Sequence, residues 1–403
     1  MHDFLLRELN NANIKKELEN IGFDSSYVNK ACEKFEYRNL KIYSLSSAQA
    51  NILKQTAISV GADCATHREV ITGKVETSDC IIGGSISQIK KIAEKLKFQP
   101  FGLKILSEKL FTICSANSLT SPQSSPKIGE GADVNELASN TAAGEVKKTK
   151  IVGILNLTDN SFSDGGLYND FDSAKNHLLE MIDEGADIID IGAESTKPYS
   201  SPVPDDEQLK KLIPVIEFAK DKIKLSIDTR SAKVAEKCLE AGAYMINDVS
   251  GLDYDGKMVD IVAKYNCPII IQHSKGNPEN MQDNPQYKDV VEEIYLDLHK
   301  KCKYAKSKGI ENIIVDVGIG FGKTREHNFE LIRRIDEFKS LGYPVMLGIS
   351  RKSFLNLDNN EERDIYTTAF NALAIERNVD YIRIHNVKMH KKLIDLMKMF
   401  VVE

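Results

Sequence analysis

The feature that most limits the fold of this chain is a series of short, β-branched runs that begins at residue 150. There are eight of them: KIVGIL (150–155), DIIDI (187–191), KIKLSI (222–227), AYMIN (243–247), CPIIIQ (267–272), NIIVDV (312–317), YPVMLGI (343–349) and DYIRI (380–384). Amphipathic segments lie between them, and several end at glycine, which is typical of helix C-termini. They include 172–185, 231–242, 287–309 and 326–342. Eight strand–helix repeats predict a closed (β/α)8 barrel, an α/β fold, whereas the alternative, a doubly wound open sheet, usually has fewer strands.

A change of composition precedes this pattern. Residues 113–149 are rich in serine, alanine, glycine, asparagine and proline and lack hydrophobic periodicity, as a flexible linker does. Residues 1–112 combine helical segments with two strand-like runs, LKIYSL (40–45) and DCIIGGS (79–85). We therefore expect a small α/β domain over 1–112, a linker over 113–149 and a barrel over 150–403. The first domain shows no catalytic motif, and its role stays open.

Composition argues against several classes of protein. The chain has 42% hydrophobic and 28% charged residues, the profile of a globular protein. Its net charge of -6 gives no reason to expect nucleic-acid binding, which usually requires a basic surplus. No apolar run approaches the roughly 20 residues of a membrane helix, and the start of the chain lacks a signal-peptide pattern. The seven cysteines form no CxxC pair. We expect a cytoplasmic protein without nucleic-acid or membrane partners.

Polar residues follow every predicted barrel strand. Because the carboxyl ends of barrel strands share one rim, we expect these side chains to surround one site. The acceptor and amide groups at separate strand ends are Asp228, Asn247 and Asp316. The cationic groups of the rim are Lys197, Lys352, Arg383 and His385. The first set suits a flat heterocycle with several N–H donors and the second suits phosphate, so we predict a donor-rich ring that carries phosphate.

The stretch VDVGIGFGKT (315–324) resembles a nucleotide-binding P-loop but fails its spacing. The motif GxxxxGK[ST] requires glycine at position 317, which is Val317. The glycines are instead expected to let the backbone pass beside a planar ligand, with Phe321 and Lys323 at the edge of that ligand.

Seven blocks, in order, resemble the dihydropteroate synthase family. They are GILNLTDNSFSDGG (153–166), DIIDIGAESTKP (187–198), LSIDT (225–229), AGAYMINDVSG (241–251), VDVGIGFGKTREHN (315–328), LGISRKSFL (347–355) and RIHNV (383–387). The resemblance implies a TIM barrel that joins 6-hydroxymethyl-7,8-dihydropterin diphosphate to 4-aminobenzoate, releasing diphosphate, in folate synthesis. It also implies a homodimer. Departure of the diphosphate leaves a cation that the arylamine attacks.

The resemblance also implies residue roles, with Asp228 and Lys352 among the catalytic groups. The implied pterin-binding residues are Asp228, Asn247, Asp316, Phe321 and Lys352. Asn156 would meet Mg²⁺ carried by the diphosphate, which Arg383 and His385 would also bind. The implied aminobenzoate-binding residues are Phe162, Thr196, Lys197, Pro198 and Ser353, the last at a helix N-terminus where an anion is favoured.

Some positions differ from the family's usual pattern. Asp159 and Asn160 stand where proline and aspartate are common, Lys197 replaces an arginine, and Asn386 replaces an aspartate. Lysine keeps the charge of arginine but not its bidentate geometry. Two alternatives to a synthase are a pterin-dependent methyltransferase and a non-catalytic pterin-binding protein. The lysine of SRKS and the ESTKP and RIHNV segments favour the synthase, because methyl transfer needs neither diphosphate-binding cations nor an arylamine loop.

Overall fold

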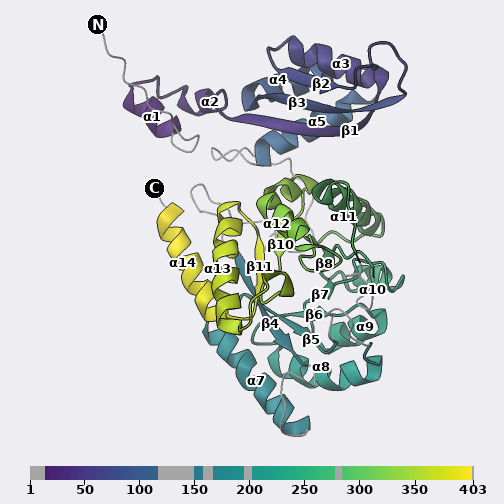
Figure 1. Ribbon diagram of the computed structural model, residues 1–403, viewed down its shortest axis with the longest axis vertical. Helices are drawn as coiled ribbons and strands as arrows, with labels where there is room; N and C mark the ends of the chain where they lie inside the picture. Colours follow the sequence, from purple (N-terminus) through teal and green to yellow (C-terminus); the bar gives the residue numbers. More distant parts are fainter. Residues whose placement is uncertain (1–13, 117–148, 158–166, 195–201, 277–283, 402–403) are drawn as a thin grey trace, which may run out of the picture. The chain divides into compact units, whose positions relative to one another are not determined.

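The computed structural model describes residues 14–116, 149–157, 167–194, 202–276 and 284–401 (Figure 1). The chain divides into two compact units, Met1–Glu130 and Gly131–Glu403, and each is described by itself. Most of the predicted linker lies outside the described residues. The last described helix of the first unit runs to Ala116, past the expected domain end at residue 112.

The N-terminal unit is a three-stranded antiparallel sheet with helices. Its elements are α1 (Ile14–Asn20), α2 (Val28–Cys32), β1 (Tyr37–Ser46), α3 (Ser47–Ile58), β2 (Asp63–Thr66), β3 (Thr77–Ser85), α4 (Ile86–Leu96) and α5 (Leu103–Ala116). The sheet has the order β1-β3-β2. Ser46 and Ser85 begin α3 and α4 through capping boxes with Gln49 and Gln88, which fix where the chain turns from strand to helix. The sequence analysis missed β2, a four-residue strand without an apolar run.

The C-terminal unit is a closed barrel of parallel strands, which confirms the predicted fold. The strands are β4 (Lys150–Asn156), β5 (Ile188–Gly192), β6 (Lys224–Asp228), β7 (Met245–Asp248), β8 (Ile269–Gln272), β9 (Ile313–Asp316), β10 (Val345–Leu347) and β11 (Tyr381–Ile384). Each pairs with its neighbours in chain order, and β11 closes the ring on β4. Each of the eight strands predicted from the sequence lies within one of these ranges or overlaps one of them.

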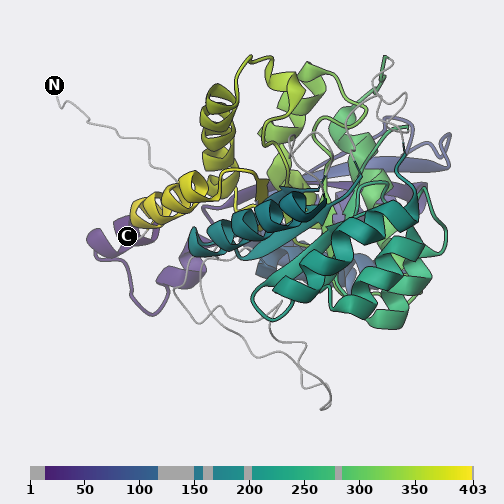
Figure 2. The same cartoon turned by 90° about the horizontal axis from the view of Figure 1, so that it is seen from below.

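Helices follow the barrel strands and cover them from outside (Figure 2). They are α7 (Leu167–Asp183), α8 (Asp205–Ala219), α9 (Ala232–Ala241), α10 (Met258–Tyr265), α11 (Val290–Ser307), α12 (Arg325–Arg333), α13 (Asn360–Glu376) and α14 (Val387–Val401), with 3-10 helices η2 (Ile335–Leu341) and η3 (Ser353–Leu355). Gly242 ends α9 with φ 112°, as the sequence suggested. The helix expected over 326–342 is instead two, because Arg334 leaves helical geometry between α12 and η2.

The barrel strands carry two apolar surfaces. Outward residues such as Ile189, Ile227 and Ile271 join the helices in the main core. Inward residues form a separate small cluster of Val152, Ile188, Met245, Ile270, Ile314, Met346 and Tyr381. Because side chains alternate along a strand, the next inward position lies two residues later, toward the carboxyl rim. Inside the barrel an apolar layer therefore lies below a polar one.

Within the described part of the chain, no helix is both long enough and apolar enough to cross a membrane.

The glycine-rich segment after β9 packs against the chain itself. A Cβ built on Gly318, whose φ is +66°, would lie 1.9 Å from the carbonyl oxygen of His273. A Cβ on Gly322 would lie 2.4 Å from the carbonyl oxygen of Lys275. The expectation that these glycines make room for a ligand is wrong for Gly318 and Gly322, since what approaches them is the backbone after β8.

We predict that Gly318→Ala is strongly destabilising. The substitution combines an unfavourable left-handed backbone with overlap on a carbonyl oxygen, and we expect a loss of more than about 2 kcal/mol of unfolding free energy in urea denaturation. Gly342→Ala is the matched control, because Gly342 has φ +83° but nothing within 4 Å of its Cβ. That change should cost about 1 kcal/mol. Equal losses for the two variants would contradict the packing argument.

Candidate active site

Polar side chains occupy the upper inward layer of the barrel. They stand two residues beyond members of the inner apolar cluster: Asp190 after Ile188, Asn247 after Met245, Asp316 after Ile314, and Arg383 after Tyr381. Asp228 on β6 lies level with Asn247 on β7 in the strand register. All five are buried, with Asn247 at 0% and Arg383 at 8% exposure. Strand alternation thus brings together residues that are far apart in the sequence.

Arg383 joins two of these carboxylates. Its Nε donates to Asp190 Oδ2 at 2.6 Å, and a terminal guanidinium nitrogen donates to Asp228 Oδ2 at 2.5 Å. Asn247 Nδ2 also donates to Asp190 Oδ2, at 3.0 Å. The Arg383 guanidinium is nearly buried, so the two carboxylates, and not water, balance its positive charge.

Three acceptor atoms of this network have no hydrogen-bond partner among the described residues: Oδ1 of Asp190, Oδ1 of Asp228 and Oδ1 of Asn247. A buried acceptor without a partner is unfavourable, and here three of them gather in one layer of the barrel. The arrangement can accept hydrogen bonds from a ligand that presents several N–H groups.

Lys352 and Phe321 add a cation and a ring to the site. Lys352 Nζ lies 4.0 Å from the centroid of the Phe321 ring. Gly320 leaves room for the lysine, because a Cβ there would be 3.3 Å from Lys352 Cδ. Burial and the nearby Arg383 charge lower the pKa of Lys352 to about 7.

The two rim aspartates are shifted in the opposite direction. Burial raises the pKa of Asp228 to about 7 against the favourable charge of Arg383, and the Asp190 charge raises it further. Burial likewise raises the pKa of Asp316, whose Oδ1 accepts a hydrogen bond from Gly318 N at 2.8 Å. Shifted acids beside a shifted lysine are typical of a functional site.

His385 is held by Ser350 at the end of the neighbouring strand. The backbone N–H of His385 donates to Ser350 Oγ at 3.1 Å, and that hydroxyl lies 2.9 Å from the ring Nδ1. The hydroxyl can donate to Nδ1 or accept from it, and the tautomer of the ring decides which. Burial and the charge of Arg351 lower the pKa of His385 to about 3. At neutral pH His385 is therefore uncharged, in contrast to the cation expected from the sequence.

Lys323, expected at the edge of a ligand, is bound by the chain itself. It is 3% exposed, and its Nζ donates to the carbonyl oxygens of Phe321 and His273 at 2.8 and 3.3 Å. The ring Nδ1 of His273 is 3.0 Å from the same nitrogen. Lys323 thus ties the glycine-rich segment to the end of β8.

The remaining residues singled out in the sequence are less constrained. Asn156 ends β4 with an exposed side chain, and Ser353 is exposed at the start of η3. Because η3 has three residues, it supplies little of the dipole expected there. The expected aminobenzoate residues Phe162, Thr196, Lys197 and Pro198 lie outside the described residues, as do Asp159 and Asn160, and their roles stay predictions.

Asp190 is the site residue that the sequence analysis did not select. The residues selected near β5 follow the strand, whereas Asp190 lies inside it, two residues before Gly192. The signal was the strand period of two, since Ile188 and Asp190 share one face. Glu194, which follows β5, pairs with Arg230 at 2.9 and 3.1 Å.

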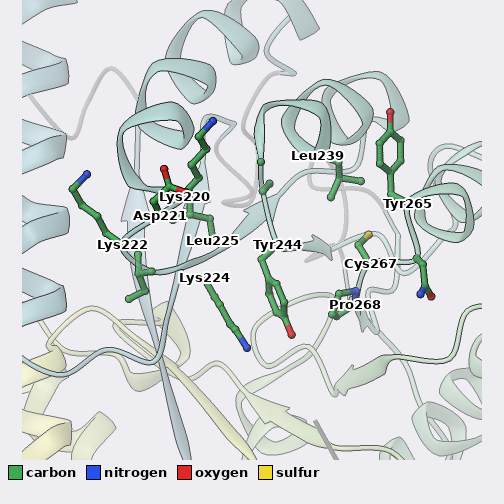
Figure 3. Close-up of a pocket in the computed structure, with 14 residues that line it drawn as sticks. Lys220, Asp221, Lys222, Lys224, Leu225, Leu239, Tyr244, Tyr265, Cys267 and Pro268 are labelled. Carbon is green, nitrogen blue, oxygen red and sulfur yellow. The ribbon is translucent and has the colours of Figure 1, made fainter. Parts of the chain in front are cut away.

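A cavity of about 630 Å³ lies at the opposite end of the barrel (Figure 3). It is lined by the N-terminal ends of β6, β7 and β8, including Lys224, Tyr244 and Pro268. Lys224 and Tyr244 extend in the same direction, with the lysine Nζ 4.6 Å from the ring centroid. The polar ring described above is not part of its lining, in agreement with barrel sites being built at carboxyl strand ends.

Known proteins resemble this chain in sequence and in fold. A family described as pterin binding enzyme matches residues 152–385. The dihydropteroate synthase of Clostridium beijerinckii is 45% identical over 249 residues, which covers 60% of this chain and 90% of the relative. A crystal structure of dihydropteroate synthase from Clostridium difficile in the presence of pteroic acid has a TM-score of 0.60 and 41% identity. It covers 64% of this chain and 98% of that one.

A further relative matches more of the chain. The probable bifunctional folylpolyglutamate synthase/dihydropteroate synthase of Haloferax volcanii is 36% identical over 345 residues, which is 84% of this chain and 40% of the relative. A match of that length extends beyond the C-terminal unit into the N-terminal one. Through its barrel, the chain belongs to the pterin binding enzyme family and, within that family, to the dihydropteroate synthases.

Proposed function

We propose that this chain condenses 6-hydroxymethyl-7,8-dihydropterin diphosphate with 4-aminobenzoate to give 7,8-dihydropteroate and diphosphate, as a cytoplasmic homodimer. The observation that carries the proposal is the set of three buried acceptor atoms on Asp190, Asp228 and Asn247 without partners. A pterin ring presents an amino group and ring N–H groups along one edge. These donors match the three acceptors in chemistry.

The pterin ring is proposed to bind between the acidic layer and Phe321. Asp316 accepts hydrogen bonds from the ring together with Asp190, Asp228 and Asn247. Lys352, beside Phe321, donates to the ring's acceptors. Arg383 fixes Asp190 and Asp228 before the ring arrives, so little reorganisation is needed on binding.

The diphosphate is proposed to lie toward Arg383 and His385. Arg383 is already paired with two carboxylates. The diphosphate oxygens would therefore share its positive charge with Asp190 and Asp228. His385 offers the N–H of its neutral ring. A diphosphate beside this ring favours its protonated form, so the pKa of His385 should rise when the substrate binds.

Mg²⁺ is proposed to enter with the diphosphate. Described residues contain no group of three acidic, histidine or cysteine side chains that could hold a metal, and Asn156 offers one exposed amide. Such a rim fits a cation whose ligands come mainly from phosphate oxygens and water. When bound, the ion would neutralise charge on the departing diphosphate.

Bond breaking is proposed to precede arylamine attack. The bond between the pterin methylene and the diphosphate oxygen breaks with both electrons leaving on oxygen, and the ring stabilises the resulting cation. The amine nitrogen of 4-aminobenzoate then forms the new C–N bond and loses a proton. The chain supplies orientation and charge stabilisation without a protein nucleophile. The arylamine is proposed to lie near Ser353 and residues 196–198.

The activity is tested with the full chain, the pterin diphosphate, Mg²⁺ and labelled 4-aminobenzoate. We expect labelled dihydropteroate and one equivalent of diphosphate, which are detected by chromatography and mass spectrometry. Asp228→Asn, which removes the charge and replaces one accepting oxygen by an NH2 donor, should form product at least about 100-fold more slowly. Ring binding without any product would reject the synthase and leave a pterin-binding protein.

We predict that Asp190→Asn weakens binding of a pterin ring about 10- to 100-fold, because Arg383 loses one carboxylate and the ring loses a charged acceptor. Isothermal titration calorimetry measures the affinity, and thermal unfolding checks that the variant is folded. Asp221→Asn is the matched control, since Asp221 is exposed at the opposite end of the barrel. Equal affinities for both variants would contradict the role of Asp190.

Ring binding should depend on pH with a maximum near pH 7. Below about 7 Asp228 takes up a proton, loses its charge and accepts less strongly, and above about 7 Lys352 loses its proton and its charge. Affinity is therefore expected to fall on both sides, as measured by fluorescence titration from pH 5.5 to 8.5. Asp228→Asn should lack the acidic fall and Lys352→Arg the alkaline one, since arginine stays protonated. The ligand's own ionisation acts on all three proteins alike, so identical profiles would refute the assignment.

A further inference from the structure

Arg351 has a backbone conformation that residues with a Cβ rarely adopt. It lies between Ser350 and Lys352, and its φ is +56°. Such a conformation persists only where surrounding contacts hold it, and such residues cluster at functional sites. The contacts of Arg351 therefore indicate what this turn is built to hold.

The guanidinium of Arg351 makes a bidentate ion pair with Asp364 on α13. Its Nε donates to Oδ1 and a terminal nitrogen donates to Oδ2, each at 2.8 Å. The Asp364 side chain is 7% exposed and the Arg351 side chain 31%. This two-bond geometry fixes orientation as well as distance.

Asn386 joins the same carboxylate from the end of β11. Its Nδ2 donates to Asp364 Oδ2 at 3.3 Å, and its Oδ1 accepts from the backbone N–H of Met389 at 3.0 Å. The second bond orients the amide so that its donor side faces Asp364. An aspartate at position 386 could not donate and would bring a second negative charge beside Asp364.

The cluster lies next to two residues of the proposed site. Lys352 follows Arg351 in the chain, and His385 precedes Asn386. Ser350 makes a second connection, because its hydroxyl binds both the backbone N–H and the ring of His385. The segments that follow β10 and β11 are thus connected twice. Ser350 contacts His385, and Arg351 and Asn386 share the Asp364 carboxylate.

We propose that Arg351, Asp364 and Asn386 are positioning residues that hold Lys352 and His385 for catalysis, with Asp364 of α13 as the carboxylate partner of Arg351. The family usually has aspartate at position 386. In this chain Asn386 is neutral and donates to the carboxylate that α13 supplies. The inference rests on the proposed function only in that Lys352 and His385 act on a pterin diphosphate.

The first test uses Asp364→Asn and Arg351→Gly in the full chain. Glycine keeps the left-handed turn while removing the guanidinium. We expect each variant to lower kcat/KM about 100-fold, since small displacements of catalytic groups are costly, and to weaken binding of pterin diphosphate without arylamine about 10-fold. Asp364→Glu should recover part of the loss. The double variant should be no worse than the worse single one, because the two residues act as a unit.

The matched control is Glu337→Gln. It breaks another bidentate pair, in which Arg334 donates to Glu337 at 2.5 and 2.8 Å in the segment leading to the N-terminal end of β10. Its kinetics should equal those of the unchanged protein. Kinetics of Asp364→Asn equal to those of this control, or fully additive losses in the double variant, would overturn the proposal.

A charge exchange keeps the proposal testable if Asp364→Asn does not fold. Asn386→Asp should lower kcat/KM about 10-fold by like-charge repulsion, and adding Asp364→Asn should restore much of it, because one carboxylate and one amide are again present. An exchange variant no better than Asn386→Asp would overturn the proposal.

Pterin diphosphate binding needs no turnover, so an inactive protein whose binding still depends on Asp364 would reject the proposed activity and support this inference.

Discussion

The active-site layer of this barrel depends on one buried guanidinium shared by two carboxylates. Arg383 contacts Asp190 and Asp228, and at an effective dielectric near 20 each such pair is worth about 4 kcal/mol of attraction. Removing a partner from a buried pair costs about 3–5 kcal/mol because a charge is left uncompensated. One cation facing two acids leaves an excess negative charge. Burial raises the pKa of Asp228 against the charge of Arg383, and the neighbouring Asp190 charge adds to that rise.

The position of this charge network follows from the alternation of strand side chains. The lower inward layer is apolar and closes the barrel floor. Two residues further along each strand, the side chain again points inward and lies nearer the open rim. Charged groups of the inward layer therefore lie where a ligand can reach them. The partnerless acceptors of Asp190, Asp228 and Asn247 lie in that layer, where hydrogen bonds from a ligand would remove their cost.

Much of the fold could be predicted from the sequence because the barrel strands are apolar on both faces, and KIVGIL or CPIIIQ stands out without any partner. The strand β2, Asp63–Thr66, could not, since its four residues become a strand only by pairing with β3. For the site, Asp228, Asn247, Asp316 and Arg383 were found because they end strands. Asp190 was overlooked within a strand, and the neutral state of His385 depends on burial that no local motif shows.

The sequence by itself determined the eight-strand repeat, the order of the rim residues and the family, because these depend on short-range periodicity and on ordered motifs. Only the tertiary structure decided which rim groups are already bound to each other. Arg383 meets Asp190 across 193 residues of chain, and Asp364 reaches Arg351 from a helix that carries no site motif. Such pairings are set by strand register and helix packing. So are the protonation states of Lys352, Asp228 and His385, because burial and neighbouring charge exist only in the folded chain.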